Sequence, residues 1–128
     1  MIFRRLKEYK RFLKSWIKIN YSLLSGSWSI TKAPKPAITI FGSSKISVEA
    51  EISQKAQQLA KKLTIGGFSI FTGGGPGIME ASNKGAYEAA EETNKNVEKR
   101  TSPLPSSVGI GVTRLNEGGI NKYVHEYI

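Results

Sequence analysis

Residues 68–80 read Phe-Ser-Ile-Phe-Thr-Gly-Gly-Gly-Pro-Gly-Ile-Met-Glu. A short apolar run, typical of a buried strand, leads into four glycines within five positions and then into the start of a helix. The glycines leave backbone N–H groups uncovered. The first N–H groups of a helix lack partners within the helix and carry partial positive charge. A strand, a glycine turn and a helix N-terminus in this order predict a seat for the phosphate of a nucleotide or a sugar phosphate.

Similar strand and helix patterns lie on both sides of this stretch. Residues 37–42 form an apolar, β-branched run that predicts a buried strand. Ser47 is placed to cap a helix that ends at the Gly66-Gly67 pair. Residues 78–92 predict the next helix, and residues 108–112 predict a third strand. The order is therefore strand, helix, strand, helix, strand.

This order predicts a βαβαβ unit. Right-handed crossovers make it a Rossmann-like, three-layer parallel sheet with helices on both faces, about half of a doubly wound α/β fold. The polar residues 93–107 exceed the usual length of a helix-to-strand loop and predict a mobile insertion. Ligands of such sheets bind beyond the carboxyl ends of the strands. Ser43, Ser44, the glycine turn and the segment after Val112 are therefore expected to meet at that edge.

Residues 1–33 predict a basic helical arm ahead of a partial α/β domain at residues 37–128. Apolar residues recur every three or four positions over residues 2–24, which predicts an amphipathic helix that ends at Gly26. Residues 1–18 hold seven Lys or Arg and one Glu, a net charge of +6 within the chain's +9. Such a helix suits an anionic membrane surface or nucleic acid, or it packs its apolar face on the domain or on a second copy. We expect the packed arrangement and do not expect nucleic acid.

The composition excludes several classes of function. The chain has no cysteine, so it has neither a disulfide framework nor a cysteine metal site. Residues 19–31, the uncharged stretch that follows the basic residues of the arm, are too few and too polar to cross a membrane, and no secretory signal is recognisable. His125 is the single histidine, and we expect it to be exposed, so no metal cluster or Ser-His-Asp group can be built. We expect a cytoplasmic protein without a metal.

The glycine turn matches neither of two well-known nucleotide-binding loops. No Gly-Lys-Ser/Thr follows it, so the lysine and the magnesium-binding hydroxyl of a P-loop are missing. Gly73 and Gly75 fit the first two positions of G-x-G-x-x-G, but Ile78 stands where the third glycine belongs. A dinucleotide enzyme that transfers hydride is therefore disfavoured.

Residues 72–86, Thr-Gly-Gly-Gly-Pro-Gly-Ile-Met-Glu-Ala-Ser-Asn-Lys-Gly-Ala, resemble the first signature of the LOG family. These are the cytokinin riboside 5′-monophosphate phosphoribohydrolases, often labelled lysine decarboxylase-like. Residues 38–44 are similar to the family's first strand and Gly-Ser loop. Residues 107–117, with residues 121–124, resemble its third strand and its Leu-Pro-x-Glu-Gln…Asn-Pro-Tyr-Val segment. The resemblance covers about residues 28–128 and is most specific at the glycine signature.

The resemblance implies hydrolysis of the N-glycosidic bond of a nucleoside 5′-monophosphate, such as AMP or a cytokinin riboside monophosphate. It also implies a Rossmann-like homodimer that needs no cofactor. Glu117 falls on the family's substrate-contacting glutamate, where a carboxylate can accept hydrogen bonds from ribose hydroxyls or the base. The implied nucleotide site is lined by the glycine turn, with the serine loop at its edge: Gly73, Gly74, Gly75, Gly77, Ser43 and Ser44.

The chain departs from the family's pattern in its catalytic half. The second signature, Pro-Gly-Gly-x-Gly-Thr-x-x-Glu, and the Arg-Lys pair before it are absent, and Leu115 and Gly118 replace a Pro and a Gln. The family's catalytic arginine and glutamate belong to the missing elements, so no catalytic residue is assigned. We expect a chain that is inactive alone, marginally stable, and dependent on a second copy or a complementing C-terminal chain. The alternative is a non-enzymatic nucleotide- or phosphate-binding module, or a degenerate remnant.

Overall fold

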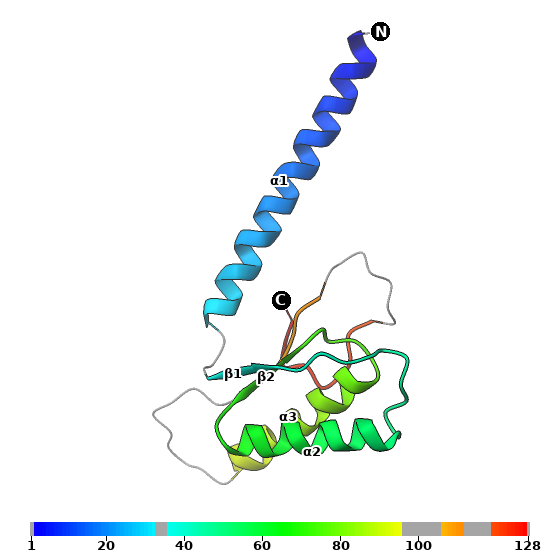
Figure 1. The fold of residues 1–128 in the computed structure, drawn as a ribbon. Helices are drawn as coiled ribbons and strands as arrows, with labels where there is room; N and C mark the ends of the chain where they lie inside the picture. Colours follow the sequence, from blue (N-terminus) through cyan, green and yellow to red (C-terminus); the bar gives the residue numbers. More distant parts are fainter. Residues whose placement is uncertain (1, 33–35, 96–105, 112–118, 128) are drawn as a thin grey trace. The chain divides into compact units, whose positions relative to one another are not determined.

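The computed structural model describes residues 2–32, 36–95, 106–111 and 119–127. The chain forms two compact units, Met1–Ala33 and Pro34–Ile128. The first unit consists of helix α1. The second holds a small parallel sheet and two further helices (Figure 1).

Helix α1 spans Ile2–Lys32 and is longer than its sequence pattern predicts. The prediction that Gly26 ends it was wrong, because the helix continues through this glycine. A glycine inside a helix costs about 1 kcal/mol relative to alanine, which a long helix tolerates. Prolines follow at positions 34 and 36, and a proline disfavours helical backbone in the residue before it. The prolines, not the glycine, therefore set the end of the helix.

The sheet of the second unit has four parallel strands in the order β1-β2-β3-β4. Ile38 lies opposite Ile70, and Phe71 lies opposite Val108. Three strands were predicted; the fourth, beside β3, has two residues and is too short to leave a periodic pattern. The third strand is also shorter than predicted. The bounds are β1 Ala37–Thr39, β2 Ser69–Thr72, β3 Ser107–Gly109 and β4 Glu126–Tyr127.

Helices α2 (Glu51–Ile65) and α3 (Ile78–Lys95) lie on the same face of this sheet (Figure 1). The α/β, Rossmann-like order of elements is as predicted, but helices were expected on both faces. Strands β1, β2 and β3 follow one another across the sheet in one direction, so two right-handed crossovers place both helices on one side. The described part of this unit therefore has two layers. Its core consists of Ala60, Ile70 and Ala86, flanked by Ile38, Ile40 and Leu63.

The opposite face of β1 is open. Ala37 and Thr39 are exposed, and Phe41, just after the strand, is 90% exposed. The prediction of a buried first strand was therefore wrong, because its alternate side chains point away from the helices. The central strand β2 is buried along its whole length.

The packing of α2 against α3 requires a glycine. A Cβ at Gly85 would collide with the backbone carbonyl of Gln57, whose carbon would lie 2.9 Å away. The same two helices are joined by an ion pair of 2.7 Å between Lys61 and Glu92. Gln57 Nε2 also donates a hydrogen bond to the Glu88 carboxylate at 3.2 Å. The absence of a side chain at Gly85 thus lets α2 and α3 pack closely enough for polar side chains of the two helices to bond to each other.

Ser47 does not cap α2, contrary to the prediction. Its hydroxyl accepts the N–H of Glu49 at 3.2 Å and donates to the Glu49 carboxylate, and its carbonyl accepts the N–H of Ala50 at 3.1 Å. These bonds close a turn ahead of the helix, and Ala50 occupies the N-cap position without a side-chain bond. The hydrogen bond from Ser47 lowers the pKa of Glu49 below its ordinary value.

Candidate functional site

The glycine turn, residues 73–77, joins β2 to α3 at the carboxyl edge of the sheet. Gly74 and Gly77 have φ angles of +71° and +75°, a region that glycine adopts without strain. A Cβ at Gly77 would also collide with the Ser43 carbonyl oxygen. Both of these glycines are buried, whereas Gly73 is exposed and Gly75 is half-buried. The fold itself therefore requires Gly74 and Gly77, and a ligand can reach Gly73 and Gly75.

The loop after β1 lies against the start of α3. The N–H of Ile78 donates to the Ser43 carbonyl oxygen at 3.2 Å. Gly42 lies so close to the Ile78 side chain that a Cβ there would collide with it. Ser43 is exposed, its hydroxyl accepts the N–H of Lys45 at 3.2 Å, and Ser44 is half-buried. The structure thus brings the two predicted serines beside the glycine turn.

A buried hydrogen-bond network supports the turn. The Thr72 hydroxyl accepts the N–H of Gly74 at 2.9 Å and donates to Asn83 Oδ1 at 2.6 Å. Asn83 Nδ2 donates to the Ser107 hydroxyl at 2.7 Å. Asn83 and Ser107 are fully buried, and Thr72 is nearly so. Because a fully bonded buried network is rigid, it fixes the turn relative to β2, α3 and β3.

Asn121 holds the turn from the segment that precedes β4. Its Nδ2 donates to the carbonyl oxygens of Gly74 and Gly75 and to Asn83 Oδ1, each at 3.0 Å. Its backbone N–H also donates to the Gly74 carbonyl oxygen at 2.8 Å. Segments that follow β1, β2 and β3 therefore meet at one edge of the sheet, as the strand order predicts.

Neither Asn83 nor Asn121 was predicted as a site residue, although the sequence carries a signal for each. Asn83 is a polar residue on the alanine-rich side of the predicted helix, where an unpaired amide would be costly. Asn121 begins the segment Asn-Lys-Tyr-Val that is similar to the LOG pattern. Both signals were visible, but only the fold shows that the two amides meet.

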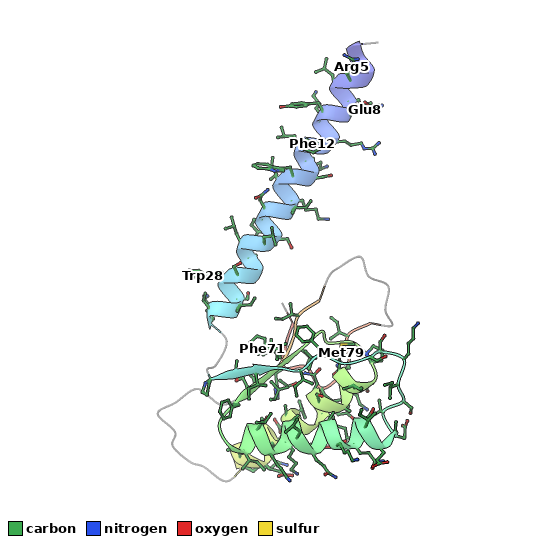
Figure 2. The ribbon with its side chains drawn as sticks, viewed as in Figure 1. Arg5, Glu8, Phe12, Trp28, Phe71 and Met79 are labelled. Atoms are coloured by element: carbon green, nitrogen blue, oxygen red, sulfur yellow. The ribbon has the colours of Figure 1, made fainter. Side chains whose placement is uncertain are left out.

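Several backbone donors of the turn remain available to a ligand. The hydrogen bonds among the described residues do not use the N–H groups of Gly73, Gly75 and Gly77. The Met79 side chain lies beside the two reachable glycines, because a Cβ on either would be 2.9 Å from its Sδ or Cε (Figure 2). A methionine is flexible enough to move aside. Open N–H groups in a turn that leads into an 18-residue helix suit an anion of the size of phosphate.

Aromatic and basic side chains lie on the segment that carries Asn121. The Nζ atoms of Lys122 and Lys84 are 5.1 and 5.9 Å from the centre of the Tyr123 ring. The Tyr87 ring stacks on His125, with ring centres 4.5 Å apart. His125 is exposed, as predicted, and its Nδ1 also accepts the backbone N–H of residue 107 at 3.2 Å. This imidazole thus has a structural role beside β3.

Two predictions fall on parts of the chain that the structure does not describe. Glu117 lies outside the described residues, as does most of the predicted loop at 93–107. Glu80, the other carboxylate near this edge, is half-buried in the first turn of α3. Within the described ranges, no group of three or more His, Asp or Glu residues could hold a metal ion.

Residues 35–93 match the model of the SLOG cluster4 family. The SLOG proteins form a nucleotide-related superfamily that includes LOG-like proteins. The matched region begins just before β1 and reaches into α3, so it contains the serine loop and the glycine turn. No curated protein matches the chain. The similarity to this family therefore covers the serine loop and the glycine turn, which form the candidate site.

Proposed function

We propose that this chain binds a nucleoside 5′-monophosphate at the carboxyl edge of its sheet, as the nucleotide-binding part of a LOG-type phosphoribohydrolase site. The 5′-phosphate accepts hydrogen bonds from the N–H groups of Gly73 and Gly75 in the turn between β2 and α3. The serine loop borders the phosphate, and Glu117 contacts the ribose or the base. The likeness of residues 35–93 to the SLOG cluster4 family supports a ligand of the nucleotide class.

One observation carries this proposal: hydrogen bonds hold the turn, while no hydrogen bond among the described residues uses the N–H groups of Gly73 and Gly75. Asn121 occupies the carbonyl oxygens of Gly74 and Gly75, and Thr72 occupies the N–H of Gly74. The N–H groups of Gly73 and Gly75 therefore belong to a backbone that these bonds hold in place. A preorganised donor set binds an anion without first losing conformational entropy, which favours affinity.

We propose that the chain binds this ligand without cleaving it. Cleavage of an N-glycosidic bond needs an acid or base and stabilisation of an oxocarbenium-like transition state. Glu80 lies in the first helical turn, where its charge suits the helix dipole and opposes a bound phosphate. The catalytic arginine and glutamate of the LOG pattern have no counterpart in the sequence. A complementing chain would supply them.

Calorimetric titration with AMP, adenosine and inorganic phosphate tests the binding. We expect AMP to bind at least tenfold more tightly than adenosine, because charge-assisted hydrogen bonds to phosphate contribute about 1.5–3 kcal/mol. Gly73→Glu places a carboxylate at an exposed position of the turn, where only the flexible Met79 side chain must move. This variant should weaken AMP binding roughly 100-fold and leave adenosine binding almost unchanged.

Gln58→Glu is the matched control, since it adds the same charge to an exposed position of α2. It should bind AMP like the parent chain. Equal affinities for AMP and adenosine, or equal losses in the two variants, would show that the turn does not hold a phosphate.

A non-enzymatic phosphate-binding module is the second candidate. It is favoured by the N–H groups of Gly73 and Gly75, which no hydrogen bond among the described residues uses and which would bind a phosphate without contacts to a ribose or a base. Chromatography of AMP incubated with the chain measures free adenine. Binding without adenine fits both candidates, and a complementing chain that restores adenine release selects the phosphoribohydrolase. Adenine release by this chain alone would refute binding without cleavage.

A further inference from the structure

Helix α1 separates basic and apolar side chains around its axis. At 100° per residue, Lys7, Arg11, Lys14 and Lys18 fall within one narrow sector. Serines continue that sector toward the C-terminal end of the helix, at positions 22, 25 and 29. We call these seven residues the basic strip.

The rest of the circumference is largely apolar, although Arg5 and Lys10 fall among its apolar residues. Every apolar side chain that the structure describes in α1 is at least 41% exposed. Single exposed apolar residues are ordinary, but a continuous array of this size marks a docking surface. We call this array the apolar arc, and Figure 2 shows its Phe12 and Trp28 side chains. It consists of Leu6, Tyr9, Phe12, Leu13, Trp16, Ile17, Ile19, Tyr21, Leu23, Leu24, Trp28 and Ile30.

Among the described helices, none is long and apolar enough to cross a membrane. The charged residues of the basic strip extend from Lys7 to Lys18 and its serines continue to residue 29, so the helix cannot place its whole circumference in hydrocarbon. A helix with Lys and Arg on one side and Trp, Phe and Leu on the other is suited to lie in the plane of a membrane interface. The tryptophans and tyrosines of the arc favour the headgroup level.

We propose that α1 binds the surface of an anionic lipid bilayer, with the apolar arc in the boundary between headgroups and acyl chains. The basic strip then faces the lipid phosphates and the anionic headgroups. Nucleic acid would neutralise the strip but leave the apolar arc in water. A second copy of α1 would cover only a narrow seam, since a two-stranded coiled coil buries two positions in seven. A bilayer covers the whole apolar arc, and its anionic headgroups also pair with the positive charges of the basic strip.

Tryptophan fluorescence of the intact chain tests this proposal directly. The chain has two tryptophans, Trp16 and Trp28, and both lie in the apolar arc. The probes are vesicles of phosphatidylcholine alone and vesicles with 30% phosphatidylserine. We expect a blue shift and vesicle flotation with the anionic vesicles, and weaker binding when NaCl is raised from 50 to 500 mM.

Two double variants separate specific lipid binding from general charge. Lys14→Gln with Lys18→Gln should weaken binding to the anionic vesicles about 30-fold, since each basic residue near the surface contributes about 1 kcal/mol. Lys55→Gln with Lys62→Gln removes the same charge from exposed positions of α2 and should change binding less than twofold. A third double variant, Leu6→Ser with Leu13→Ser, should abolish the blue shift with the anionic vesicles.

Four results would overturn the proposal. The first is an unshifted spectrum with anionic vesicles. The second is equal loss of binding in the α1 and α2 lysine variants. The third is a blue-shifted spectrum without lipid, together with a dimeric mass in sedimentation, which would assign the apolar arc to a second copy. Binding to a 30-base-pair DNA that exceeds binding to vesicles at 150 mM NaCl would assign the basic strip to nucleic acid.

Discussion

Helices α1 and α3 are both long, yet the side chains on their apolar faces differ in size. The buried face of α3 consists of Ala81, Ala86, Ala89 and Ala90, each at most 2% exposed. In α1 the corresponding side chains are Leu, Ile, Phe, Tyr and Trp, and all of those described are exposed. Small side chains let a helix approach a sheet and another helix closely, whereas large ones need a broad apolar surface. The small side chains of α3 thus suit a helix that packs into a core, and the large side chains of α1 suit a helix that presents an apolar surface.

The two helices also use polar side chains differently. In α3, Asn83 is fully buried and bonded to Thr72, Ser107 and Asn121. In α1, Asn20 donates one hydrogen bond to a backbone carbonyl of its own helix. Asn83 thus connects four segments of the α/β unit by hydrogen bonds, whereas Asn20 bonds only within α1.

Replacing these two asparagines should give the largest contrast. Asn83→Ala leaves buried groups of Thr72, Ser107 and Asn121 without a partner, and we expect it to lower the free energy of unfolding by about 4 kcal/mol. Asn20→Ala should change it by less than about 0.5 kcal/mol. Urea unfolding followed by circular dichroism measures both. Equal effects would show that the buried network does not stabilise the α/β unit.

The glycine of α3 gives the next largest effect. Gly85→Ala forces α2 and α3 apart, because the added Cβ meets the backbone of Gln57. We expect a loss of about 3 kcal/mol, since backbone cannot yield as a side chain can. Thermal unfolding of the intact chain provides the measurement. An unchanged melting temperature would contradict the close helix contact.

The same substitution in α1 should act in the opposite direction. Gly26→Ala removes a glycine from the helix interior, and we expect it to favour the helix by about 1 kcal/mol. The helical signal at 222 nm should rise slightly, and vesicle binding should be retained. A fall in helicity would mean that residues around Gly26 need the freedom of glycine.

The smallest effect concerns the ion pair between α2 and α3. The hydrogen bond from Lys61 to Glu92 raises the pKa of Lys61 above its ordinary value. A raised folded-state pKa stabilises the fold below the unfolded pKa of lysine, and this contribution disappears as pH rises through the folded value. Glu92→Gln should lower the pKa of Lys61 in an NMR titration. Glu51→Gln, which removes the partner of Lys55 within α2, should not.

Local patterns in the sequence predicted the segment around the glycine turn well. The apolar run predicts β2, and the glycines predict that α3 begins at Ile78. These two features depend only on residues that are neighbours in the sequence. The cap and stop signals were less reliable. Ser47 bonds to Glu49 in a turn of its own. Helix α1 continues through Gly26 because a single glycine costs a long helix only about 1 kcal/mol.

Features that depend on distant residues could not be predicted. The side on which α2 and α3 lie follows from the order of the strands, which no single segment encodes. The role of Asn121 depends on its meeting Gly74, which is 47 residues away in the sequence. The strand β4 is too short to carry a pattern and forms because β3 offers it an edge.

The bonds from Asn121 also bear on the order of events during folding. Units β1-α2-β2 and β2-α3-β3 join strands that are neighbours in the chain, so each can form as soon as it is synthesised. The glycine turn receives its last hydrogen bonds only when residue 121 returns to it. Closing that longer loop costs more entropy than a local turn. The glycine turn therefore becomes rigid late in folding. A ribosome-bound chain that ends before residue 121 would contain the glycines without the hydrogen bonds that hold them.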